Sequence, residues 1–190
     1  MTTSDKPVVL PRAGVRGAAL AMTVVCAAQF VLQLDFSVVN VALPTIQREL
    51  GMAAAQLQWI VTGYALTFGS LLLAGGPLAD LLGRRRLLAA GLVVFALASL
   101  ACGLAQWPVM LIIARVIQGA AGAMVSPAAL SLLTTLNPEG PARNRALAIW
   151  QATTAAGATT GIIAGGLLTQ YLGWRAVFLV NPSALVTPHM

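Results

Sequence analysis

The sequence predicts an all-α membrane protein, and three observations support that fold class. Hydrophobic residues make up 58% of the 190 residues and charged residues only 8%, about a third of the charge that is usual in soluble domains. Long, nearly uncharged runs alternate with short polar connectors, and no strand-like alternation of any length is present. Because backbone groups in lipid must pair within their own segment, these runs are expected to be helices.

The predicted elements follow one another through connectors that contain proline or glycine. Residues 1–16 are expected to form a cytoplasmic tail, and residues 17–190 one transmembrane bundle. The run that starts this bundle is too long for the apolar part of a signal peptide, so it is interpreted as a retained first helix. In chain order, the spans are expected at about 17–43, 57–78, 87–106, 108–134, 146–171 and, incomplete, 177–190. The turn signals between them are Pro44, Gly76-Pro77, Gly83, Pro108, Asn137-Pro138, Gly140-Pro141 and Gly173.

The basic residues are distributed unevenly among these connectors. Eight of the eleven lie in the N-terminal tail and in the connectors that follow the second and fourth spans. The positive-inside rule then places the N-terminus in the cytoplasm, in an integral multi-pass protein of the cell membrane. The net charge of +6 is interpreted as loop arginine that faces anionic lipid. The bilayer is therefore an expected partner, and nucleic acid is not.

Two opposite charges interrupt the predicted spans. Asp35 lies nine residues before Pro44, which places it about 13 Å from the outer end of its span. Arg115 lies seven residues after Pro108, about 10 Å from the same side. The two side chains are therefore expected at similar depths, where an ion pair or a shared wet cavity would lower the free energy of burying them. One interpretation is a structural ion pair that fixes helix packing. The other is that Asp35 binds and releases a proton, with Arg115 biasing that equilibrium.

Other polar and small residues surround these two charges in the sequence. Gln118 lies one helical turn from Arg115 and is expected to hydrogen-bond into the same space. The helical face that continues from Arg115 carries only small residues, which are Gly119, Gly122 and Ser126. These small side chains predict a cavity beside the arginine. Asn40 lies about 140° around its helix from Asp35. It is interpreted either as a local hydrogen-bond donor at a helix end loosened by Pro44 or as a contact on another wall.

Four stretches in order resemble motifs of one family, the fourteen-span drug:proton antiporter branch of the major facilitator superfamily. They are LDFSVVNVALP at 34–44, GPLADLLGRRR at 76–86, RVIQGAAGA at 115–123 and GATTGIIAGG at 157–166. The resemblance implies the N-terminal six-helix bundle of that fold, with an incomplete sixth helix. It also implies proton-coupled export of drugs or other small molecules, powered by the proton gradient, with no cofactor, no metal and no enzymatic activity.

The resemblance assigns roles to particular residues. Those implied in proton and substrate coupling are Asp35, Asn40, Arg115 and Gln118. Those implied in a cytoplasmic gate loop, with the glycines at its tight turns, are Gly76, Asp80, Gly83, Arg84, Arg85 and Arg86. Those implied in the antiporter motif, as a smooth face for helix packing, are Gly157, Gly161, Gly165 and Gly166. The sequence departs from the family pattern at Leu81, where a basic residue is common, and at Ile162, where proline is common.

The remaining expectations concern partners and other classes of protein. Alternating access requires two bundles around one site, so the expected partners are a small-molecule substrate and a C-terminal half outside these 190 residues; the chain is expected to be a truncated fragment. A non-transporting structural membrane fragment and a proton-coupled transporter of another metabolite stay open. An intramembrane hydrolase is disfavoured, because Ser126 lacks the G-x-S-x-G context and the sole histidine, His189, lies at the chain end. A channel is disfavoured because no filter motif is present.

Overall fold

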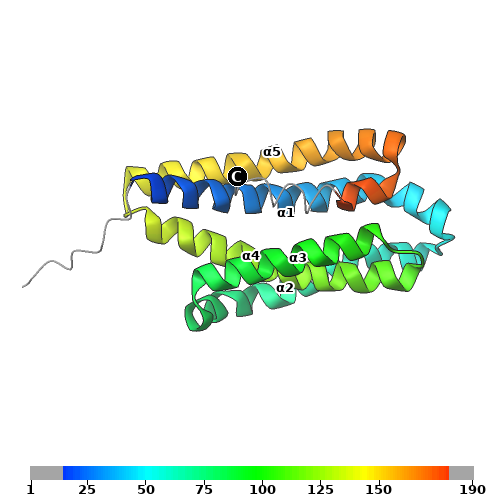
Figure 1. Ribbon diagram of the computed structural model, residues 1–190, viewed down its shortest axis with the longest axis horizontal. Helices are drawn as coiled ribbons and strands as arrows, with labels where there is room; N and C mark the ends of the chain where they lie inside the picture. The colour runs from blue at the N-terminus through cyan, green and yellow to red at the C-terminus, as the bar shows by residue number, and fades with distance from the viewer. Residues whose placement is uncertain (1–14, 180–190) are drawn as a thin grey trace, which may run out of the picture.

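Five α-helices account for nearly all of residues 15–179, the part of the chain that the computed structural model describes (Figure 1). Their bounds are α1 Val15–Leu50, α2 Ala54–Leu82, α3 Arg84–Gly103, α4 Pro108–Leu136 and α5 Pro141–Leu172. Residues 174–179 are also helical, and no strand occurs in the described range. The predicted all-α fold class is confirmed. Most of the expected tail, 1–16, and of the incomplete sixth span, 177–190, lies outside the described residues.

The first helix is longer than predicted. It continues through Pro44 to Leu50 and ends at Gly51, whose φ of +60° suits glycine. The prediction that Pro44 ends this helix was wrong. Proline removes a single backbone donor, and the residues on both sides of Pro44 continue the helix across that gap.

The second helix also passes through a predicted turn. Residues Gly76 and Pro77 lie inside α2, which ends only at Leu82. The prediction of a tight turn at Gly76 was therefore wrong, because glycine tolerates helical dihedrals and the following leucines and alanine favour a helix. The turn between α2 and α3 consists of Gly83, with a φ of +86°.

The helices pack in two adjoining groups, shown in Figure 1. Helix α1 lies along α5, while α4 packs against both α2 and α3 and also contacts α1. Glycines allow these close approaches. A Cβ atom on Gly75 of α2 would lie 2.6 Å from the carbonyl oxygen of Ala123, and one on Gly91 of α3 would lie 2.7 Å from Val125. Small residues at helix interfaces are typical of membrane bundles, where close packing drives association.

Within the described residues, four helices, α1 to α4, contain stretches long and apolar enough to cross a membrane. Helix α5 has 32 residues, about 48 Å of helix, but its middle is rich in threonine and glycine and is less hydrophobic. It covers the predicted span at 146–171 and lies alongside α1 (Figure 1).

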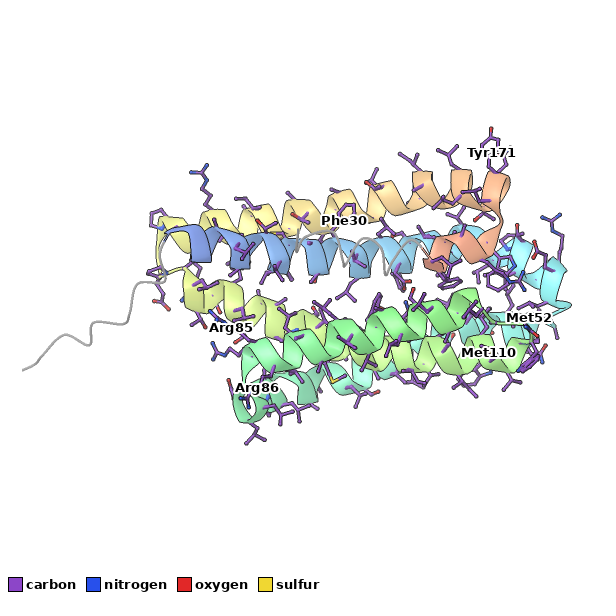
Figure 2. The ribbon with its side chains drawn as sticks, viewed as in Figure 1. Phe30, Met52, Arg85, Arg86, Met110 and Tyr171 are labelled. Atoms are coloured by element: carbon purple, nitrogen blue, oxygen red, sulfur yellow. The ribbon has the colours of Figure 1, made fainter. Side chains whose placement is uncertain are left out.

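Connectors predicted to share one side of the membrane lie at one end of the bundle. Figure 2 places Arg85 and Arg86, at the start of α3, at the same end as the connection between α4 and α5. Met52, Met110 and Tyr171 lie at the opposite end. The helices therefore alternate in direction as the spans require.

Replacement of Pro44 with alanine tests the continuity of α1. We expect Pro44→Ala to leave the helix intact and to stabilise the protein by about 1–3 kcal/mol, because alanine restores the missing N–H donor and is the better helix former. Pro44 is exposed, so few packing contacts oppose the change. Circular dichroism and detergent-induced unfolding measure both effects. A loss of helix content would contradict the continuous α1.

Candidate functional site

The two charges predicted at similar depth meet between α1 and α4. An Nη1 atom of Arg115 lies 2.6 Å from Oδ2 of Asp35. Both residues are buried, with exposed fractions of 1% and 0%. A charge pair this far from solvent interacts more strongly than one at the surface, because neither water nor salt screens it.

Gln118 closes a ring of hydrogen bonds around this ion pair. Its Oε1 accepts a bond of 2.7 Å from Arg115 Nη1, and its Nε2 donates one of 2.9 Å to Asp35 Oδ1. The Nε of Arg115 also donates to the carbonyl oxygen of Ile60 in α2, at 3.4 Å. From α3, the thiol of Cys102 lies 3.7 Å from Gln118 Oε1. We call Asp35, Arg115 and Gln118 the buried charged cluster.

An aromatic side chain that the sequence analysis missed lies against this cluster. The guanidinium carbon of Arg115 lies 4.2 Å from the centre of the Tyr64 ring. Tyr64 in turn stacks on Phe68 of the same helix and contacts Phe36 of α1. A tyrosine within an apolar span is usually a packing residue, so its sequence context gave no signal for this contact.

The space predicted beside Arg115 at Gly119 and Gly122 is filled by α2. The small residues of α4 instead allow α2 to approach closely. A Cβ atom on Gly122 would lie 3.1 Å from the ring of Phe68 and 3.2 Å from the hydroxyl of Tyr64. The prediction of open space at these glycines was wrong, because the same glycine spacing also serves tight helix packing.

Asn40 lies apart from the buried charged cluster. Its side chain is exposed, and its Nδ2 donates a 2.7 Å bond to the carbonyl oxygen of Phe36 one turn earlier. Of the two interpretations left open by the sequence, this geometry matches the local hydrogen bond.

The predicted gate loop is a short turn with one ion pair. Arg84 lies 3.3 Å from Asp80 and also donates to the Ser131 carbonyl at 3.4 Å and to the hydroxyl of Thr135. These contacts tie the α2–α3 turn to α4. The side chains of Arg85 and Arg86 are exposed, and Figure 2 shows them at the end of the bundle. Gly83 forms the turn, whereas Gly76 lies within α2.

Three of the four glycines predicted on α5 face α1. A Cβ atom on Gly157 would lie 2.8 Å from the Phe30 carbonyl oxygen, and one on Gly161 would lie 2.7 Å from that of Leu34. A Cβ atom on Gly165 would lie 3.1 Å from the Cα of Val38. Gly166 differs, because nothing lies within 4 Å of its hypothetical Cβ.

The family assignment follows from a comparison with known families. The family model described as Major Facilitator Superfamily matches residues 25–187. The chain belongs to this superfamily. The match covers the buried charged cluster, the gate loop and the α5 glycines. Residues 15–179 hold no group of three histidine, cysteine, aspartate or glutamate side chains that could bind a metal ion.

Individual superfamily members match most of this chain. The puromycin resistance protein pur8 of Streptomyces alboniger is 48% identical over 166 residues, which are 87% of this chain and 33% of that protein. The cephamycin export protein CmcT of Amycolatopsis lactamdurans is 48% identical over 164 residues, 86% of this chain and 34% of that protein. The chain thus spans about a third of the length of these curated relatives.

A solved structure has a similar arrangement of helices. It is a bacterial homologue of the human lysosomal transporter Spinster, in an inward-facing and unoccupied conformation. The match has a TM-score of 0.71 at 21% identity and covers 90% of this chain and 41% of the other. This likeness supports the arrangement of the helices, and the residue chemistry rests on the contacts described above.

Proposed function

We propose that this chain forms the N-terminal part of a proton-coupled exporter of drugs or other small molecules. The observation that carries the proposal is the buried charged cluster, in which Asp35 lies 2.6 Å from Arg115 at the crossing of α1 and α4. Ionisable residues inside membrane bundles are rare and mark ion or proton pathways more often than packing sites. The two relatives of 48% identity, named for puromycin resistance and cephamycin export, support the substrate class.

In the proposed mechanism, Asp35 is the proton carrier. When Asp35 is ionised, Arg115 and Gln118 hold its two oxygens. Uptake of a proton removes the negative charge and weakens the contact with the guanidinium. The free energy of the contact between α1 and α4 then differs between the two protonation states of Asp35. A transporter can couple that difference to the exchange between its inward-open and outward-open states.

The other predicted residues fit supporting roles in this proposal. The ion pair of Asp80 and Arg84 would form part of a cytoplasmic gate against a second bundle, which we propose as the partner of this chain. The glycine face of α5 would keep α1 and α5 together during the conformational change. The N-terminus would be cytoplasmic in the cell membrane, since the basic connectors share one end of the bundle.

A chimaeric transporter tests the proposal with a drug readout. Residues 25–187 would replace the matching segment of the puromycin resistance protein. We expect the chimaera to confer puromycin resistance and Asp35→Asn to reduce it to the level of cells without the transporter, at an unchanged amount of membrane protein. The reason is that asparagine keeps the shape of Asp35 and one of its two acceptor oxygens but cannot exchange a proton.

A matched control is Glu139→Gln, which also neutralises a carboxylate but at an exposed ion pair with Arg143. This variant should keep full resistance. If Asp35→Asn also kept full resistance, Asp35 would not be the proton carrier. If Asp35→Asn lowered the amount of protein instead, the cluster would be a structural ion pair.

A further inference from the structure

The contact between Arg115 and Tyr64 is buried in the bundle. The guanidinium carbon is 4.2 Å from the ring centre, and Tyr64 is 4% exposed. A guanidinium over an aromatic face is attracted by the negative charge of the ring face, and this attraction is stronger where water is excluded. The contact therefore stabilises the positive charge of Arg115 without an ionised partner.

Helix packing fixes the ring in this position. The ring of Tyr64 stacks on that of Phe68, with 5.9 Å between centres and 8° between planes. A Cβ atom on Gly122 would lie 3.2 Å from the Tyr64 hydroxyl, so the glycine leaves just enough space for it. Gly119 packs against the backbone of Tyr64. None of these contacts depends on the charge of Asp35, so the ring stays in place when that charge changes.

The contacts of Arg115 respond differently to a proton on Asp35. The bond to Asp35 Oδ2 is then no longer an ion pair. The bonds to Gln118 Oε1 and to the Ile60 carbonyl have neutral acceptors, so they do not change. The aromatic face of Tyr64 is also unchanged. These neutral groups are what would hold the guanidinium in the protonated state of the cluster.

We propose that Tyr64 is a positioning residue that holds Arg115 when Asp35 is protonated and so sets the pH at which the cluster takes up a proton. This inference rests on the proposed function, because it requires Asp35 to bind the proton. In the ionised state Asp35 itself holds the guanidinium, whereas in the protonated state the loss of the ring would let Arg115 move. The free energy of proton uptake would then differ from that of the parent protein.

Titratable groups from three other helices lie around Asp35. The titratable groups that face Asp35 are Arg115 from α4, Tyr64 from α2 and, through Gln118, Cys102 from α3. Helix α5 presents Gly161 to α1 at this level. Its titratable residues in the described range lie toward its ends and are Arg143, Arg145 and Tyr171.

Infrared titration of the complete chain in lipid nanodiscs tests the inference without a transport assay. The chain has only five acidic side chains, so subtracting the spectrum of Asp35→Asn isolates the carboxylic acid band of Asp35. We expect Tyr64→Leu to shift the midpoint of this band by about one unit, a tenfold change in proton affinity. Tyr64→Phe keeps the aromatic face and should stay close to the parent protein.

The outcomes separate this inference from the proposed function. An Asp35 band that never titrates would overturn both. A band that titrates with the same midpoint in the parent and in Tyr64→Leu would overturn only the role of Tyr64. If Tyr64→Leu does not fold, nitrogen-15 NMR of the parent protein tests whether Arg115 stays over the Tyr64 ring. The Arg115 Nε signal must then keep its ring-current shift at the acid pH where Asp35 is protonated, and its loss would overturn the inference.

Discussion

Arg115→Met is expected to destabilise the folded chain by about 3–5 kcal/mol, the range found when one partner of a buried ion pair is removed. Methionine is long and flexible enough to fill much of the space, so the loss is mainly electrostatic. Asp35, with an exposed fraction of 0%, would stay in the interior without the guanidinium that lies 2.6 Å from it. Unfolding of the purified chain by sodium dodecyl sulfate in mixed micelles, followed by tryptophan fluorescence, measures the change.

A double variant shows whether that loss comes from charge. Combining Arg115→Met with Asp35→Asn removes both charges, and replacing a buried pair by uncharged groups is often close to neutral. The double variant should therefore recover most of the lost stability. Arg85→Met is the matched control, because Arg85 is exposed and such changes stay within about 0.5 kcal/mol. A double variant as unstable as Arg115→Met would assign the loss to packing instead of charge.

The membrane fold and the central ion pair were predictable because each follows from counting residues along the sequence. Long apolar runs have one stable form in lipid, the helix. The depths of Asp35 and Arg115 follow from the helical rise, since both spans start or end at the same side of the membrane. Two opposite charges buried at one depth are expected to form an ion pair, because pairing lowers the free energy of burying them. The contact of Gln118 with this pair follows from its position one helical turn from Arg115. The structure places these three side chains together.

The helix ends were less predictable, because proline and glycine have more than one use. Pro44 and the pair Gly76-Pro77 lie within continuous helices, while Gly51 and Gly83 end them with positive φ angles. The local sequence does not determine whether a glycine adopts a left-handed conformation. That choice depends on which arrangement lets the following helix pack.

Contacts across helices were the least predictable part of the site. Tyr64 lies in an apolar run, and nothing in its local sequence indicates that Arg115 of a distant helix will lie over its ring. The glycines of α4 predicted open space, yet Gly122 receives the aromatic side chains of α2. A small residue indicates that something comes close, and only the packed bundle shows whether that is a ligand, water or another helix.

Gly161→Val is expected to destabilise the chain by about 3 kcal/mol, at the upper end of the range for overpacking a dense interior. A Cβ atom at Gly161 would lie 2.7 Å from the Leu34 carbonyl oxygen and 2.8 Å from the Ser37 Cβ. Neither neighbour is the end of a flexible side chain, so α1 and α5 must move apart. The same detergent-induced unfolding measures the loss.

The matched control for this substitution lies five positions along the same helix. Nothing lies within 4 Å of a Cβ atom at Gly166, so Gly166→Val makes the same change in helix propensity without the steric contact. The difference in stability between the two variants therefore reports the α1–α5 contact by itself. Because Leu34 adjoins Asp35 in α1, separating the helices at Gly161 should also shift the infrared band of Asp35, whereas Gly166→Val should leave it in place. Equal stability and equal bands in the two variants would mean that α5 does not hold α1 through this glycine face.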